Sequence, residues 1–197
     1  SKTAQKGLPA SVILQSNEIT VRLDGMKFCF MNRIEWKGRL MAIDSPYAHY
    51  GTVFMIKGKK GFVGSGHMET GEKEIVESLS ITGDGKKIEP MDGASFKASV
   101  FHVRKQSRMN VFHLTYDLYI DGNIITERSE TTSDADCDIS LMYHFMHPWS
   151  TDFSELLTVM PDGKEVSHRF VSDEKFPVYG PCPIAVFYNS KTGDGVV

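Results

Sequence analysis

Six Asp-Gly pairs punctuate the chain, and they constrain its fold more than any other feature. The pairs occupy residues 24–25, 84–85, 92–93, 121–122, 162–163 and 194–195. A type I′ hairpin turn needs positive φ at both central residues, and Asp or Asn followed by Gly adopts this conformation at little cost. The chain is therefore expected to fold as antiparallel strands joined by tight turns.

The segments beside these turns alternate as strands do. In VFHLTYDLYI, residues 111–120, one face is wholly apolar or aromatic, as a strand packed on a core requires: Phe112, Leu114, Tyr116, Leu118 and Ile120. The same interpretation applies to EITVRLDGMKFCFMNRI, GTVFMIKG, SFKASVFHV, CDISLMYHFM and VSHRFV. The stretch GEKEIVESLSITGDG starts with acidic residues as helices do, but its apolar residues alternate with serines. We therefore predict that it is extended.

The sequence thus predicts an all-β protein with little helix, an antiparallel β-sandwich of the supersandwich or jelly-roll type. No linker or low-complexity segment divides the 197 residues. We expect a flexible segment over residues 1–10 and one β-sandwich domain over residues 11–197. Because the last valines follow a turn signal and read as the start of a strand, the domain is expected to be truncated at its C-terminus.

The composition disfavours several classes of partner. The net charge is −3, whereas nucleic acids and anionic membrane surfaces attract basic proteins. No apolar run approaches the roughly 18 residues of a membrane span. The chain starts with Ser1, so we expect a processed N-terminus and a secreted or periplasmic protein, with a cytoplasmic location left open. The oligomeric state is left open.

The sequence also predicts no metal and no cofactor. There is no CxxC, HExxH or GxSxG motif, and the seven histidines are scattered. The cysteines, Cys29, Cys137 and Cys182, allow one disulfide at most, and unpaired thiols are the favoured interpretation. His144 and His147 would share one face of a helix but point to opposite sides of a strand. Since the segment reads as a strand, these two histidines are not expected to bind one ion.

Pro148 is expected to end this strand and to begin a loop that contains Trp149 and Asp152. An aromatic ring can stack on the apolar face of a pyranose, while polar groups bind its hydroxyls. These residue types in a loop therefore indicate a sugar site. The alternative is that Trp149 closes one end of the sandwich and that the carboxylates are simply solvated.

Two further segments contain candidate site residues. In AIDSPYAHYGTVF, residues 42–54, the loop contains Tyr47, His49 and Tyr50, and such side chains beside a sugar can act as general acid or base. In GFVGSGHMETGEKE, residues 61–74, His67 and Glu69 lie two apart and share one face of an extended chain. They form either an acid–base couple or an ordinary surface pair.

Basic residues offer contacts to acidic sugars. Arg128 follows the turn at Asp121-Gly122, and HVRKQSRMN contains Arg104, Lys105 and Arg108. These side chains could bind uronate carboxylates. For HVRKQSRMN we favour the alternative interpretation, in which the segment forms a turn that contains these basic residues.

The segments KQSRMNVFHLTYDLYIDGNIITERSETTS and DCDISLMYHFMHPWST resemble the galactose-mutarotase-like β-supersandwich. This fold is shared by aldose 1-epimerases, some glycosidase domains and several polysaccharide lyases, and its members are commonly longer than this chain. The resemblance implies a glutamate base that opens the sugar ring and histidine acids. The candidates it leaves open are His67, His144 or His147 and Glu69, Glu127 or Glu130.

The favoured hypothesis is a carbohydrate-active protein that binds a sugar or polysaccharide in a sheet groove, with His or Tyr and a carboxylate as acid–base catalysts. The predicted catalytic residues are His147, His67, Glu69, His49 and Tyr50. The predicted substrate-binding residues are Trp149, Tyr47, Arg128, His144 and Asp152. The alternatives are a polysaccharide lyase, a non-catalytic carbohydrate-binding module and an interaction domain. A catalytic site should place a histidine and a carboxylate within hydrogen-bond reach of each other.

Overall fold

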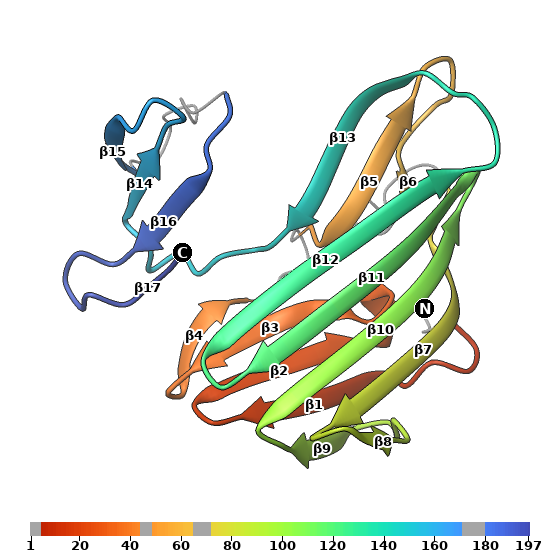
Figure 1. Cartoon of the computed structure of the whole chain (residues 1–197), viewed down its shortest axis with the longest axis horizontal. Helices are drawn as coiled ribbons and strands as arrows, with labels where there is room; N and C mark the ends of the chain where they lie inside the picture. Colours follow the sequence, from red (N-terminus) through yellow and green to blue (C-terminus); the bar gives the residue numbers. More distant parts are fainter. Residues whose placement is uncertain (1–4, 44–48, 65–71, 171–179) are drawn as a thin grey trace. The chain divides into compact units, whose positions relative to one another are not determined.

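A computed structural model describes residues 5–43, 49–64, 72–170 and 180–197. The chain divides into two compact units, Ser1–Pro148 and Trp149–Val197 (Figure 1). The stretch that the sequence indicates as one domain, residues 11–197, therefore contains two units that meet in sequence after Pro148. The first strand begins at Ser11.

The described strands of the first unit form three sheets. The first sheet has the order β4-β3-β2-β1-β9 and contains β1 (Ser11–Ser16), β2 (Ile19–Asp24), β3 (Phe30–Trp36), β4 (Arg39–Ala42) and β9 (Ala94–Lys97). The second has the order β12-β11-β10-β7-β8 and contains β7 (Ile75–Gly83), β8 (Lys86–Ile88), β10 (Val100–Met109), β11 (Phe112–Asp121) and β12 (Ile124–Ser133). The third has the order β13-β5-β6 and contains β5 (Gly51–Ile56), β6 (Val63–Gly64) and β13 (Ile139–Met146).

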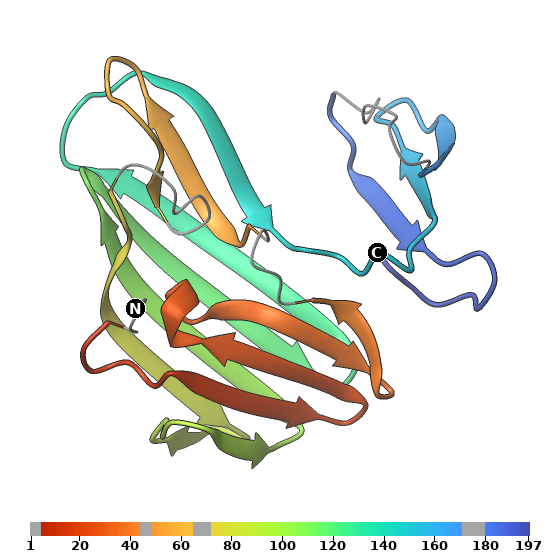
Figure 2. The same ribbon diagram turned by 180° about the vertical axis from the view of Figure 1, so that it is seen from behind.

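The first and second sheets lie face to face, as Figures 1 and 2 show from opposite sides, and this confirms the predicted all-β sandwich. Paired strands are antiparallel except β1 and β9, which are parallel. In β11 every second residue from Phe112 to Ile120 is buried, as the alternation predicts. Burying a large apolar side chain contributes about 1.5–3 kcal/mol, so this inner face is a principal source of stability.

The turns agree with the prediction only in part. Among the six Asp-Gly pairs, all of which are described, Asp84-Gly85 alone has positive φ at both residues (47° and 75°), and it joins β7 to β8. Asp121 instead pairs with Ile124, so the turn is formed by the two residues between them. Asp24 caps the short 3-10 helix η1 (Gly25–Lys27) by accepting a hydrogen bond from Met26 N at 2.8 Å.

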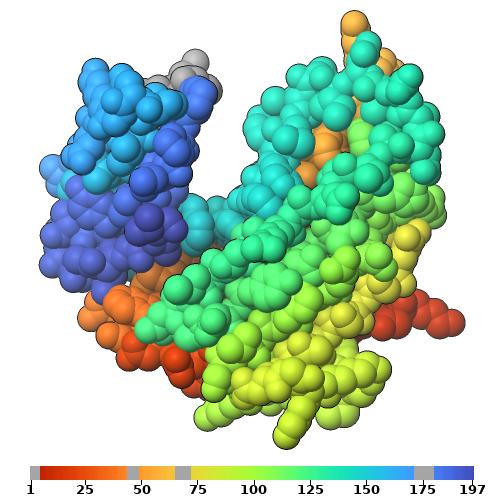
Figure 3. Space-filling view, in the orientation of Figure 1, coloured from red at the N-terminus to blue at the C-terminus, as the bar shows by residue number. Residues whose placement is uncertain are grey.

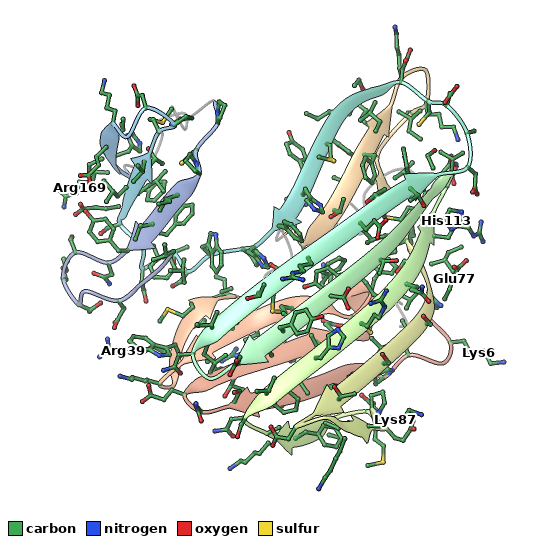
Figure 4. The ribbon with its side chains drawn as sticks, viewed as in Figure 1. Lys6, Arg39, Glu77, Lys87, His113 and Arg169 are labelled. Atoms are coloured by element: carbon green, nitrogen blue, oxygen red, sulfur yellow. The ribbon has the colours of Figure 1, made fainter. Side chains whose placement is uncertain are left out.

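Two local predictions have clear outcomes. Residues 75–83 form β7, so the extended interpretation of this acidic stretch is confirmed. The favoured turn in HVRKQSRMN is wrong, because residues 100–109 form β10. The alternation of β10 places Arg104 and Arg108 on the exposed face and Lys105 in the interior. Figure 4 shows Glu77 and His113 projecting from the solvent side of the same sheet.

The second unit is a small antiparallel sheet with the order β15-β14-β16-β17. It contains β14 (Glu155–Val159), β15 (Glu165–Arg169), β16 (Ile184–Tyr188) and β17 (Gly195–Val196). The ring of Phe187 lies 6.1 Å from the ring of Trp149 and 6.1 Å from that of Phe170, and these contacts organise its aromatic side chains.

All three cysteines are free thiols, and Cys29 is the buried one. Within the described residues, no helix has the length and apolar character needed to cross a membrane.

Candidate functional site

Glu127 lies on the inner face of β12, where most neighbours on the adjoining strands are apolar. It pairs across the sheet with Leu118, and its side chain is 13% exposed. Arg128 pairs with Asp117 on the opposite, solvent-facing side. A carboxylate buried to this degree needs hydrogen-bond donors to offset the loss of water.

Two donors hold the Glu127 carboxylate. The imidazole Nε2 of His147 donates to Oε2 at 2.6 Å, and the hydroxyl of Tyr116 donates to Oε1 at 2.5 Å. The His147 side chain is 10% exposed, and Tyr116 is buried in the core. Burial, and next the negative charge of Glu127, raise the pKa of Tyr116 well above its usual value. Tyr116 therefore keeps its proton and acts as a fixed donor to the carboxylate.

A β-bulge in β13 lies beside both nearby histidines. Tyr143 pairs with Val53 and Met146 with Gly51, so three steps along β13 match two along β5. Phe145 absorbs the extra residue with φ of 50°. A bulge of this kind interrupts the alternation of side chains. The expectation that the two histidines face opposite sides of the strand is therefore wrong.

His144 completes the group of side chains around Glu127. Its Nδ1 is hydrogen-bonded to the hydroxyl of Thr52, a buried residue of β5, at 2.5 Å. Burial lowers the pKa of His144, and the negative charge of Glu127 partly opposes this effect. Thr52 of β5 thus meets His144 of β13, while Glu127 of β12 meets Tyr116 of β11 and His147, which directly follows β13. Figure 3 shows atoms of β5 between those of β12 and β13, where the surface is hollowed.

The depressed pKa of His144 makes stability depend on pH. Burial disfavours the imidazolium of His144, whereas histidines of the unfolded chain have a pKa of about 6.5. As the pH falls below that value, the unfolded state binds protons more readily, and the free energy of unfolding decreases. We expect the free energy of unfolding, measured in urea, to fall less between about pH 7.5 and pH 5 in His144→Gln than in the unsubstituted protein. Equal losses would rule out this role of His144.

Lys105 is a fully buried basic residue of strand β10, which pairs with β11. Its Nζ forms an ion pair with Glu74 Oε1 at 2.8 Å and donates to the carbonyl oxygen of Phe28 at 2.7 Å. The ammonium also lies over the ring of Phe30 at 3.4 Å and over that of Tyr116 at 5.5 Å. Burial lowers the pKa of Lys105, and the charge of Glu74 opposes this shift. The ion pair is thus flanked by aromatic rings inside the sandwich.

Cys29 lies in the same region and is expected to be inert. Burial raises the pKa of its thiol to about 11, although the charge of Lys105 partly opposes the shift. Because the thiolate is the reactive form, an aromatic disulfide reagent should modify Cys137 and Cys182 in the folded protein and Cys29 only after unfolding in urea. Three thiols that react at similar rates without urea would contradict this expectation.

The other predicted site residues are dispersed. Tyr50 is buried and donates from its hydroxyl to the carbonyl oxygen of Ile43 at 3.2 Å, which indicates a packing role rather than contact with a ligand. His49 is half-buried just before β5. Arg128 is exposed on the far face of β12, so it does not join Glu127.

Two predicted residues belong to the second unit, and three cannot be placed. Trp149 is half-buried and packs near Phe187, while Asp152 is exposed. His67, Glu69 and Tyr47 lie outside the described residues. Of the predicted site, the structure therefore brings together His144 and His147.

Several members of the group around Glu127 were not selected by sequence reasoning. Glu127 was one of three carboxylates that the family resemblance left open, and Tyr116 was assigned to the core. Thr52 was missed, and Lys105 was considered only with Arg104 and Arg108, as a uronate contact or as part of a turn. One signal was available for Lys105, because it alternates in register with Phe101, Val103 and Met109 on the buried face of β10, which also contains Ser107.

In the part of the chain that the structure describes, no three His, Cys, Asp or Glu side chains converge as metal ligands. The arrangement is instead that of a hydrogen-bonded carboxylate and imidazole, which can exchange a proton and share a charge. No family model matches the chain, and comparison with curated proteins and with solved structures gives no match either.

Proposed function

We propose that the first unit acts on a carbohydrate, as a β-sandwich of the galactose-mutarotase-like kind with Glu127 and His147 as its acid–base couple. The observation that carries this proposal is the 2.6 Å hydrogen bond between the two side chains on the inner face of the sandwich. Both side chains keep a small exposed fraction, 13% and 10%, so neither is sealed in the core. A carboxylate and an imidazole in this contact can exchange a proton with each other and with a bound substrate.

The chemistry that suits this couple is proton transfer at the reducing end of a sugar. One group removes the proton from the anomeric hydroxyl while the other donates a proton to the ring oxygen. The bond between the anomeric carbon and the ring oxygen then breaks, and the anomeric carbon becomes an aldehyde. Ring closure on the other face returns both protons and gives the opposite anomer. No redox partner is needed, and each acid–base group supplies about 10²–10⁴ in rate.

One observation favours this reaction over a polysaccharide lyase. A lyase of the type considered needs a tyrosine or histidine base and an arginine for the uronate carboxylate. Arg128 lies on the opposite face of β12 from Glu127. The described residues therefore suit a neutral sugar better than a uronate.

A second candidate function is carbohydrate binding without catalysis by the second unit. It is favoured by the aromatic group of Trp149, Phe187 and Phe170, in which Phe187 and Phe170 are nearly parallel, with 2° between their ring planes. Aromatic rings of this kind can stack on sugar rings. Trp149→Ala should then weaken sugar binding more than it lowers the melting temperature. A large loss of folding with unchanged binding would assign Trp149 to packing.

A glycan array with the full chain tests the binding part of the proposal, and anomer exchange tests the catalytic part. The array should retain the protein on at least one class of sugar. For that sugar in its free form, two-dimensional exchange NMR should show faster interconversion of α and β anomers with protein than without. His147→Gln should suppress this exchange while binding persists. A blank array would remove both carbohydrate functions, and full exchange by His147→Gln would remove His147 from the mechanism.

A further inference from the structure

The inner face of β12 is polar and opens to solvent beyond Glu127, unlike the inner face of β11. Ser129, Thr131 and Ser133 pair with inward-facing residues of β11, so they share the face of Glu127. Ser129 is half-buried, and Thr131 and Ser133 are exposed, whereas their partners on β11 are buried. From Glu127 onwards, β12 thus presents a row of uncharged hydroxyls instead of a core.

Strand β13 borders the same row of hydroxyls from the third sheet. The segment 134–138 joins β12 to β13 at one end, and the hydrogen bond between Glu127 and His147 joins them at the other. Figure 3 shows a hollow between the two strands, with atoms of β5 inside it. From Glu127 to Ser133 a strand rises about 20 Å, which exceeds the width of a single sugar ring.

The side of β13 that faces the second sheet offers an apolar surface. The rings of Phe54 on β5 and Phe112 on the inner face of β11 stack at 4.3 Å, so this face of β5 is turned towards the second sheet. Met142 pairs directly with Phe54, and directly paired residues lie on one face. The Met142 side chain therefore faces the second sheet, and it is 51% exposed.

The Ser129 hydroxyl has no hydrogen-bond partner among the described residues, although its oxygen is buried. Buried polar groups in proteins are nearly always hydrogen-bonded. Because Ser129 is half-buried on an edge strand, rotation about χ1 can turn its hydroxyl towards the hollow. A hydroxyl of a bound ligand would there supply the missing partner.

The charges along the hollow favour a neutral ligand. Ser129, Thr131 and Ser133 offer hydroxyls and no cation to a uronate. At the far end, the segment 134–138 adds Asp134 and Asp138, whose side chains are 69% and 80% exposed. Carboxylates beside a binding surface disfavour a polyanion. Neutral sugar units instead present hydroxyls to one wall and C–H groups to the other.

We propose that this hollow, the β12 groove, binds a neutral oligosaccharide with its reducing end at the Glu127–His147 couple. The following units lie along Ser129, Thr131 and Met142. The substrate of the first unit is then a reducing oligosaccharide rather than a free monosaccharide. The position of the reducing end rests on the proposed function, whereas binding along the β12 groove does not.

The test uses the full chain with 1,4-linked oligomers of glucose, galactose, mannose and xylose, from one to four units. NMR of the anomeric protons measures both affinity and anomer exchange. In at least one series, we expect the tetrasaccharide to bind about 10-fold or more tightly than the monosaccharide, because each added hydrogen bond contributes roughly 2–10-fold.

Thr131→Val removes one hydroxyl and keeps the shape of the side chain. It should weaken tetrasaccharide binding by roughly 2–10-fold and leave monosaccharide binding unchanged. Thr132→Val is the matched control, since Thr132 is also exposed but lies on the opposite face of β12. Both sugars should bind to this variant as to the unsubstituted protein.

Equal affinities for monosaccharide and tetrasaccharide in every series would overturn the β12 groove, and so would equal tetrasaccharide binding by the two threonine variants. Length-dependent binding that Thr131→Val weakens, without faster anomer exchange, would uphold the groove and reject the proposed reaction. Faster exchange of monosaccharides with no gain from longer chains would do the reverse. If none of these sugars binds, both proposals fail.

Discussion

Glu127→Gln will lower the rate of anomer exchange by about 10²–10⁴-fold and change the affinity for the sugar little. The amide keeps the shape of the side chain and one acceptor for Tyr116 or His147, but it carries no charge. It therefore cannot accept a proton as the carboxylate does. The rate constant and the half-saturating sugar concentration, measured separately by exchange NMR, distinguish a catalytic effect from a binding effect.

Glu130→Gln is the matched control for this substitution. Glu130 lies three residues further along β12, on the solvent side of the sheet, where it pairs with Thr115. It should keep the exchange rate of the unsubstituted protein. Two outcomes would remove Glu127 from the proposed couple. One is an unchanged exchange rate in Glu127→Gln, and the other is an equally large loss of rate in Glu130→Gln.

Lys105→Met alone will destabilise the protein by about 3–5 kcal/mol, because it leaves the buried Glu74 carboxylate without its cation. Lys105→Met/Glu74→Gln should recover most of this loss, since neither charge then remains in the core. The free energies of unfolding are measured in urea at neutral pH. Removing Lys59, whose ion pair is exposed, should cost no more than about 1 kcal/mol. A single variant as stable as the unsubstituted protein would show that the ion pair contributes nothing to folding.

The fold could be predicted because its determinants are local. Alternation of apolar and polar residues indicates strands wherever one face is buried, and β11 shows this pattern over its whole length. The failures were also local. The Asp24-Gly25 pair satisfies a turn rule, yet Asp24 caps η1, because its side chain can accept from Met26 N. A dipeptide signal does not distinguish these two uses.

The site was harder to predict because it depends on an irregularity. Strict alternation separates His144 from His147, but the extra residue of the bulge at Phe145 interrupts it, and His147 reaches Glu127. Phenylalanine rarely adopts positive φ, so nothing in the local sequence signals a bulge there. The partners of His147 come from β11 and β12, and only the strand register shows that they meet. Arg128 was selected for its charge, but its position in β12 sends it to the other face.

The proposed function requires that a sugar reaches the Glu127–His147 couple in the first unit. The measurement that tests it most directly is ¹H–¹⁵N NMR of the His147 imidazole during titration with the sugar that the glycan array identifies. We expect the His147 ring resonances to shift and saturate as the sugar binds, and we expect Glu127→Gln to reduce the shift. Saturable binding that leaves the His147 ring resonances unchanged would contradict it.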